Sequence, residues 1–287
     1  MANDLTIAFD PGASGTYDLQ GGTLSVGGII NNDTFNWTGG TLNYNSPLTI
    51  GTAGPLGAAL VLDSDMALNT PAETIAAAGT LTQTGGNHTV TGELRVDGTY
   101  HLTGGDVTVS DWTIGLAGKV SGGAGDVFKV DHSFSNHSVQ KTSWDTELAE
   151  LLLSGSFMTM ELAGADYGAD YAGYTDNFAW GIFHIGSAIT ELIIRDGVTG
   201  NRGAALYVGL FEIDGGLTDL SKIFSDYNIY YDAALTGNGW LGGKSYALNG
   251  SGSLMPVSSV PEPTSMLLIG TGLIGLIGRG RTKRKAA

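Results

Sequence analysis

The segment YDLQGGTLSV at residues 17–26 decides the fold of this chain, because it places a glycine pair inside an alternating run of apolar and polar residues. The same pattern returns as FNWTGGTLNY at 35–44, LTQTGGNHTV at 81–90 and YHLTGGDVTV at 100–109. Alternation with a period of two is typical of a strand that buries one face and exposes the other. A glycine pair allows the backbone a positive φ, so each copy predicts two short strands joined at a corner.

Units of this size cannot bury an apolar face alone, so neighbouring copies must stack. The repeats therefore predict a β-solenoid-like region over residues 1–132, with one rung per repeat and ladders of Thr and Asn on its outside. The alternative is a meander or sandwich in which each glycine pair marks a hairpin turn. Residues 53–78 are rich in Ala and Leu, are interrupted by Pro71 and lack the glycine pair. They predict an irregular rung or a loop.

From about Asn136 the glycine-pair period disappears. Short apolar runs follow, such as FMTMEL at 157–162 and ALYVGLF at 205–211, separated by turn-forming stretches. This alternation of short strands and turns predicts a β-sandwich-like domain over residues 133–255. The fold class expected for the chain is therefore all-β, with two different β halves.

The last segment, 256–287, has a different composition. A Pro-Glu-Pro motif precedes fifteen uncharged, mostly apolar residues at 264–278, and a cluster of basic residues closes the chain. Fifteen helical residues span about 22 Å, less than the roughly 30 Å of a hydrocarbon core. We expect a single C-terminal transmembrane helix that anchors the chain transiently, with its basic end in the cytoplasm. The basic residues are Arg279, Arg281, Lys283, Arg284 and Lys285.

This order of parts resembles the PEP-CTERM sorting signal of Gram-negative bacteria that make extracellular polysaccharide. Pro261, Glu262 and Pro263 stand where that family has its Pro-Glu-Pro motif. The resemblance implies recognition and cleavage by an exosortase, transient residence in the inner membrane, and delivery to the cell envelope or the medium. It covers about a tenth of the chain, so it implies nothing about the role of the rest. Residues 1–4 carry no export signal, and we expect that the true start lies upstream.

Charge and composition exclude several classes of partner and site. Before Arg279 the chain has eight basic residues against 28 acidic ones, so it would repel nucleic acid and anionic lipid. The absence of cysteine excludes disulfides and thiolate metal sites. A solvated acidic surface is the favoured interpretation of the charge.

A glycine-rich loop at residues 164–176 holds the most specific candidate site. Its carboxylates and tyrosines are compatible with a calcium site or with a groove in which aromatic rings stack on sugars. An ordinary surface loop is the favoured interpretation, and no cofactor is expected beyond this calcium alternative. The candidate residues are Asp166, Asp170, Tyr171, Tyr174 and Asp176.

No catalytic motif occurs in the sequence. Asp63 and Asp65 would point the same way on a strand, as a polysaccharide-cleaving enzyme requires of its acids, but few basic residues accompany them. His132 and His137 are a weak candidate for a metal pair. We therefore expect a non-enzymatic exported protein of the envelope or the exopolysaccharide matrix. The alternative is a carbohydrate-binding module or adhesin, and an enzyme is less favoured.

Overall fold

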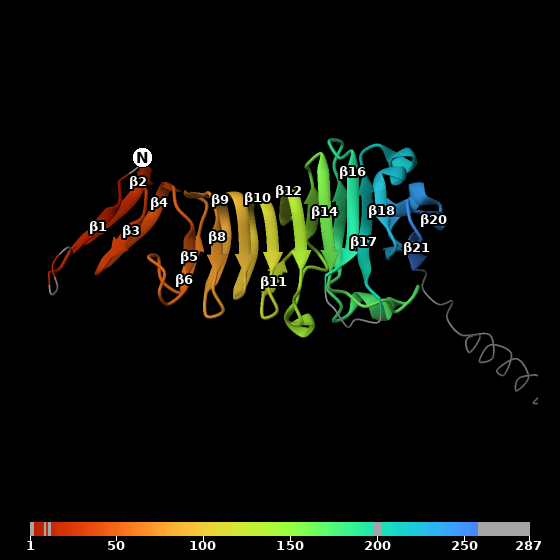
Figure 1. Ribbon diagram of the computed structural model, residues 1–287, viewed down its shortest axis with the longest axis horizontal. Coiled ribbons are helices and arrows are strands. Elements are labelled where there is room, and N and C mark those ends of the chain that lie inside the picture. Colours follow the sequence, from red (N-terminus) through yellow and green to blue (C-terminus); the bar gives the residue numbers. More distant parts are fainter. Residues whose placement is uncertain (1–2, 9, 11–12, 198–202, 258–287) are drawn as a thin grey trace, which may run out of the picture.

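The protein is a rod of stacked parallel strands, seen here in a computed structural model (Figure 1). The structure describes residues 3–8, 10, 13–197 and 203–257. Each strand pairs with the strand one turn of the chain later, so the hydrogen-bonded ladders run along the rod. The β-solenoid predicted from the glycine-pair repeats is confirmed.

The first half contains the rungs built from the repeats. β1 and β3 pair with each other, as do the long strands β2 and β4, all in parallel. β9 and β10 are longer still and turn two corners each, so that one strand serves three ladders. The bounds are β1 Leu5–Ile7, β2 Thr16–Val26, β3 Ile29–Asn31, β4 Thr34–Tyr44, β5 Leu48–Ile50, β6 Ala59–Leu62, β7 Met66–Thr70, β8 Glu73–Ile75, β9 Thr80–Val96 and β10 Thr99–Ile114.

The glycine pairs form the corners, as the sequence predicts. The second glycine of each pair has a positive φ: 71° at Gly22, 86° at Gly40, 67° at Gly86 and 87° at Gly105. These corners stack on one another, and a Cβ added to Gly105 would lie 2.5 Å from the carbonyl of Gly85. No side chain fits between backbones at that distance, so the stack requires glycine for its packing as well as for its φ.

Residues 53–78 form a regular rung instead of the irregular one expected. β6, β7 and β8 pair in parallel with three successive parts of β9. The turn around Ser64 replaces the glycine corner here, and it lies directly against the next corner. A Cβ on Gly85 would lie 2.7 Å from the backbone nitrogen of Ser64. A turn of different composition therefore takes the same place in the corner stack.

Polar side chains form ladders on the outside of the first rungs, which confirms the expectation for asparagine. The Asn43 amide donates to the hydroxyl of Ser25 over 2.9 Å, and the Asn69 amide donates to the Asn43 side-chain oxygen over 2.8 Å. Each bond joins equivalent positions of neighbouring rungs. The exposed face thus reinforces the same stacking that the buried face produces.

The second half continues the same solenoid, so the predicted β-sandwich is wrong. Its strands pair in parallel with the strand after next, whereas a sandwich of this kind is built from antiparallel sheets. β12 crosses position 132 and pairs on both sides of it. The bounds are β11 Lys119–Gly122, β12 Val127–Asn136, β13 Glu150–Leu153, β14 Phe157–Leu162, β15 Trp180–Ile185, β16 Glu191–Asp196, β17 Ala205–Ile213, β18 Ile223–Ser225, β19 Asn228–Asp232, β20 Tyr246–Ala247 and β21 Ser253–Val257. Among the described residues, four 3₁₀ helices lie between strands: η1 at Lys141–Ser143, η2 at Tyr171–Tyr174, η3 at Gly216–Lys222 and η4 at Thr236–Leu241.

The length of the rungs varies along the chain, which hides the solenoid from sequence inspection. Thr16 of β2 pairs with Thr34, eighteen residues later. Phe157 of β14 pairs with Glu191, thirty-four residues later. The added residues form loops such as the one between β14 and β15, while the strands keep their register.

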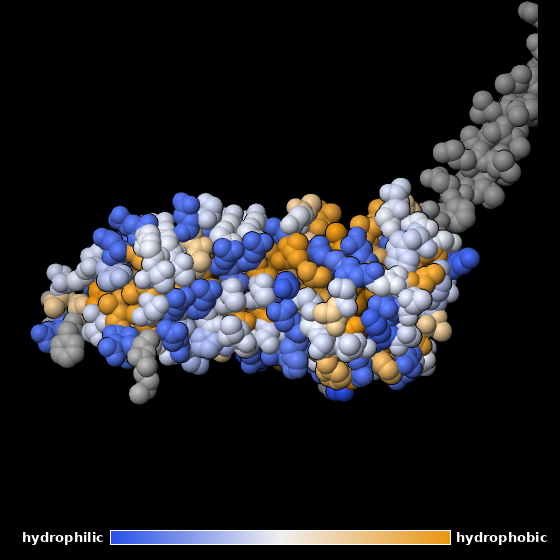
Figure 2. Space-filling view, turned by 90° about the horizontal axis from the view of Figure 1, so that it is seen from above, coloured by the Kyte–Doolittle hydropathy of each residue, from blue (hydrophilic) through white to orange (hydrophobic). Residues whose placement is uncertain are grey.

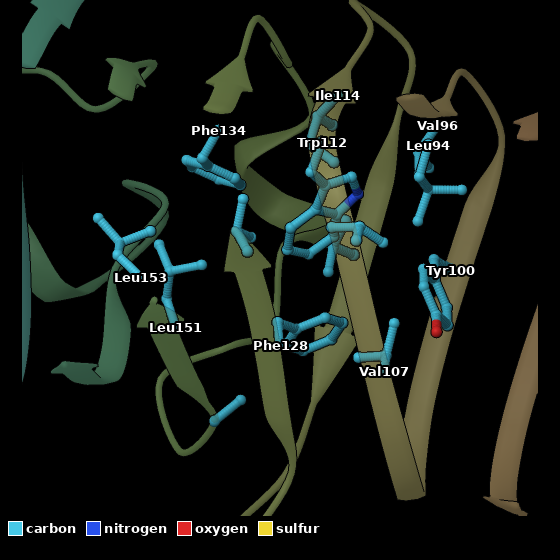
Figure 3. Close-up of a cluster of buried hydrophobic side chains, with 14 of the residues drawn as sticks. Leu94, Val96, Tyr100, Val107, Trp112, Ile114, Phe128, Phe134, Leu151 and Leu153 are labelled. Carbon is cyan, nitrogen blue, oxygen red and sulfur yellow. The ribbon is translucent and has the colours of Figure 1, made fainter. Parts of the chain in front are cut away.

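The inside of the rod is a column of apolar side chains that runs from Ile7 to Leu254. Its centre is aromatic (Figure 3). Trp112 stacks on Phe128 with ring centroids 4.9 Å apart and meets Phe134 edge-on at 5.3 Å. Burial of such rings stabilises the packing of neighbouring rungs.

The last rung closes the described part of the rod. β20 and β21 are antiparallel, the one such strand pair among the described residues. β21 contains Pro256, which has no N–H to offer to a further strand. Solenoids need terminal units that stop the stacking, and this hairpin fits that role.

The predicted transmembrane helix at 264–278 lies outside the described residues. Within the described ranges, no helix has the length and apolar character needed to cross a bilayer.

Candidate functional site

The predicted loop lies between β14 and β15, where η2 carries both candidate tyrosines. Tyr174 is built into a tyrosine cluster and does not face the solvent freely. Its ring meets that of Tyr207 edge-on at 5.6 Å, and its hydroxyl donates to the carbonyl of Val208 over 3.0 Å. Tyr207 in turn stacks on Tyr230 at 4.6 Å. Burial raises the pKa of Tyr174 well above its usual value, so this phenol stays neutral.

Tyr171 lies at the edge of the same cluster and is 37% exposed. Its hydroxyl donates to a carboxylate oxygen of Asp232 over 2.7 Å, and its ring is 5.6 Å from that of Tyr174. Desolvation first, and then the bond to Asp232, raise the pKa of Tyr171 to about 12. Tyr167, before η2, is 47% exposed. The loop therefore exposes two tyrosine rings to the solvent. Of these, only Tyr171 was among the candidates from the sequence.

The three aspartates of the loop lie in separate surroundings, and hydrogen bonds occupy the carboxylates of Asp166 and Asp170. Asp166 accepts a hydrogen bond from the hydroxyl of Tyr230 over 2.9 Å, and Asp170 caps η2 by accepting from the backbone N–H of Ala172 over 2.8 Å. Asp176 stands at a positive φ of 50°. Across the described ranges, no three His, Asp or Glu side chains come together in an arrangement that could hold a metal ion. The calcium alternative thus has no ligand cluster in this loop.

His132 and His137 do not form a pair. The imidazole of His132 lies 2.5 Å from Asp111, and that of His137 lies 2.8 Å from Glu161. Each histidine therefore bridges to a carboxylate on a neighbouring rung. This is the outer-ladder pattern of the first half, with contacts between imidazole and carboxylate groups in place of amide contacts.

Asp63 and Asp65 lie in the turn between β6 and β7 and not on a strand as expected. The side chain of Asp63 accepts from the backbone N–H of Asp65 over 3.1 Å. This local bond shapes the turn that replaces a glycine corner. The two side chains therefore do not project side by side as an acid pair on one strand face.

His184 has three acidic neighbours in the structure, and the sequence analysis did not single it out. On β15, Nδ1 of His184 lies 2.8 Å from Glu150 and 3.9 Å from Glu212, and Nε2 lies 3.0 Å from Asp214. Burial opposes protonation, but the hydrogen bonds to Asp214 and Glu150 outweigh it and raise the pKa of His184. The bond to His184 is also the main cause of the lowered pKa of Asp214. His184 and its acidic neighbours therefore form a charged network that spans three rungs.

A second polar group lies inside the rod, also unforeseen. The hydroxyl of Tyr100 donates to Gln83 over 2.7 Å and lies 3.0 Å from Nδ1 of His88, whose Nε2 is 3.0 Å from Glu73. The side chains of His88 and Glu73 are fully buried. A buried polar chain of this kind stabilises the fold only while each member keeps its partner.

Comparison with known families identifies the end of the chain. Residues 259–284 match the PEP-CTERM protein-sorting motif. This chain carries a PEP-CTERM sorting signal. The match includes Pro261, Glu262 and Pro263 and all of the basic cluster except Lys285. These residues lie outside those that the structure describes.

The PEP-CTERM motif implies processing by an exosortase, and with it export and membrane-associated sorting. The motif accounts for the tail alone, since the match begins after β21 ends. No curated protein and no solved structure matches the chain. The role of the rod therefore has to be argued from its own chemistry.

Proposed function

We propose that the protein is an exported, non-enzymatic component of the cell envelope or the exopolysaccharide matrix. The observation that supports this most is the combination of a PEP-CTERM motif with an extended, strongly acidic solenoid. A rod of stacked rungs presents a long, regular surface suited to a structural or adhesive role. Figure 2 shows one face of that surface as a mixture of hydrophilic and hydrophobic patches.

Absence of a fitting acid pair among the candidates also favours a non-enzymatic role. In the loop at 164–176, the carboxylate of Asp166 binds a tyrosine hydroxyl and that of Asp170 caps a helix, and the carboxylate of Asp63 shapes a turn. A glycosidase needs two carboxyl groups facing a substrate about 5–10 Å apart. Each of these carboxylates instead has a structural role.

A carbohydrate-binding role is the second candidate. The exposed rings of Tyr167 and Tyr171 favour it, because aromatic faces pack against the apolar faces of sugars. It makes a separate prediction: the protein should be retained on the cell's own polysaccharide, and Tyr171→Ala should weaken that retention. Tyr174→Ala is a poor test, since it would disrupt the buried tyrosine cluster.

The decisive experiment is the intact mass of the protein recovered from the envelope and from the medium of the producing cell. A terminus near Pro261–Pro263 outside the inner membrane supports the proposal, and added glycan mass would show attachment to polysaccharide. An uncut chain ending at Ala287 and confined to the inner membrane would overturn it. Release of reducing ends or unsaturated sugars from the polysaccharide by the purified protein would overturn the non-enzymatic role.

A further inference from the structure

A groove of about 510 Å³ opens on the outer face of the rod, where β16, β18 and the turn at 249–250 meet. Ile193 of β16 pairs with Phe224 of β18, and Phe224 forms a bridge with Asn249. Figure 1 shows these strands side by side near the C-terminal end of the rod. Ligand sites typically measure roughly 300–1,000 Å³, so the groove is large enough to hold a small ligand or part of a polymer.

An aromatic ring forms part of the lining. Phe224 is 37% exposed, whereas its neighbours Ile223 and Ser225 are buried, so its side chain points out of the rod. Tyr227 lines the groove as well. An outward phenyl group in a hollow has no packing role in the core. It offers a flat apolar face to a ligand.

Polar groups of several kinds surround that ring. Arg195 supplies a guanidinium group, Asp226 a carboxylate and Asn249 an amide. Together they can donate to and accept from neighbouring hydroxyl groups, which need both kinds of partner. An aromatic face beside such mixed donors and acceptors fits a sugar ring, because the ring has apolar C–H faces and a hydroxyl rim.

The polar rim is held in place before any ligand arrives. Asp226 accepts hydrogen bonds from the backbone N–H of Ser251 over 2.9 Å and from its hydroxyl over 2.8 Å. The backbone bond and then the hydroxyl bond lower the pKa of Asp226, which keeps it ionised. The turn is also rigid, since Gly250 packs so closely on Ser225 that a Cβ there would lie 2.4 Å from its carbonyl oxygen. Preorganisation of this kind reduces the entropic cost of binding.

The charges favour an uncharged sugar. The lining of the groove contains one guanidinium, that of Arg195, and the carboxylates of Asp196 and Asp226. Before Arg279 the whole chain has eight basic residues against 28 acidic ones, so its field repels polyanions. We propose that the groove built on Phe224 binds segments of a neutral polysaccharide. This inference rests on the proposed function, in which the rod resides in extracellular polysaccharide.

Affinity electrophoresis and titration calorimetry test the proposal with the full chain in a detergent that lacks a sugar headgroup. The probes are the producing cell's polysaccharide, the neutral glycans dextran, laminarin and cellohexaose, and the anionic glycan alginate. Phe224→Ala should weaken binding of a neutral glycan roughly tenfold or more, as expected for an aromatic anchor. Asn249→Ala should weaken it less, because it removes hydrogen bonds but leaves the stacking face.

Phe157→Ala is the matched control. Phe157 lies on β14 in the same ladder, is 44% exposed and does not line the groove. Its loss should leave binding unchanged. Circular dichroism checks that all three variants fold.

Three outcomes would overturn the inference. The first is no binding of the wild-type chain to any neutral glycan. The second is tighter binding to alginate than to all neutral probes. The third is equal binding by Phe224→Ala and the wild type. Retention of both on the producing cell's polysaccharide would then show that the proposed function stands and that the groove is not the binding site. Failure of the proposed function has a different signature, namely confinement of the uncut chain to the inner membrane.

Discussion

Gly105→Ala tests whether the glycine corners hold the rungs together by direct backbone contact. The substitution has two costs. An L-residue in the left-handed region loses roughly 1–2 kcal/mol, and Gly105 has a φ of 87°. The new Cβ would also lie 2.5 Å from the carbon and oxygen of the Gly85 carbonyl, so the two rungs must separate locally. Overpacking of this kind costs roughly 1–3 kcal/mol.

Gly125→Ala is the matched control. Gly125 has nearly the same φ, 88°, but a Cβ there would meet nothing within 4 Å. It lies in the turn between β11 and β12, within the rod and away from its ends. Its substitution should therefore show the conformational cost alone, roughly 1–2 kcal/mol. The difference between the two variants isolates the contact between stacked corners.

Urea unfolding followed by far-ultraviolet circular dichroism measures both variants, and hydrogen exchange locates the change. We expect Gly105→Ala to lose about 2–5 kcal/mol, from the conformational and packing costs together, with faster exchange in β9 and β10. Equal destabilisation by the two variants, or an exchange pattern with no change at the corner, would refute the stacked-corner reasoning.

Three further predictions concern other parts of the chain. Tyr100→Phe should destabilise the protein by about 1–3 kcal/mol in urea unfolding, because it deprives the buried His88 of a hydrogen-bond partner; an unchanged midpoint would show that the buried network contributes nothing. His184→Gln should remove a stabilisation that is complete below the usual histidine pKa of about 6.5 and is lost as pH rises through the raised pKa of the folded state. Wild type and variant should therefore converge in thermal stability above that raised pKa, and parallel curves across this range would contradict it. Replacing Pro261 and Glu262 with alanine should leave full-length protein in the inner membrane, and normal release of a shortened chain, measured by intact mass, would rule out the sorting motif.

The first half of the fold could be predicted because one local feature repeats. A glycine pair within an alternating run determines both the corner and the buried face, and copies at short, regular spacing imply stacking. The rung over 53–78 was not predicted, because the turn around Ser64 forms its corner in place of a glycine pair. Composition differs there, yet the backbone fills the same space.

The second half could not be read in the same way. Its strands pair across as many as thirty-four residues, as between Phe157 and Glu191, and loops of variable length lie between them. Short apolar strands with irregular spacing are equally typical of a sandwich. Pairing direction is a long-range property, and alternation within one strand does not encode it.

The same limit applies to the candidate sites. Residues adjacent in sequence, such as those of the loop at 164–176, were found, but their partners were not. The bond from Tyr171 to Asp232 joins positions 61 residues apart, and no local pattern in the sequence predicts it. His184 and the groove around Phe224 are likewise assembled from different rungs. The tail is the opposite case, since its motif is contiguous and could be recognised directly.

The direction of the hydrogen bonds gives the rod an uneven response to mechanical load. The ladders run along its length, and the chain continues toward the sorting motif from Val257, in the last strand of the described stack. Tension applied there along the rod loads the bonds between β21 and β19 first, and the remaining ladders only after these have failed. The protein should therefore unravel rung by rung at low, nearly constant force, with the sorting end yielding first and the glycine-cornered rungs last. A load applied across the strands at one rung would be shared by all of that rung's bonds at once, so the rod should resist sideways shear better than extension.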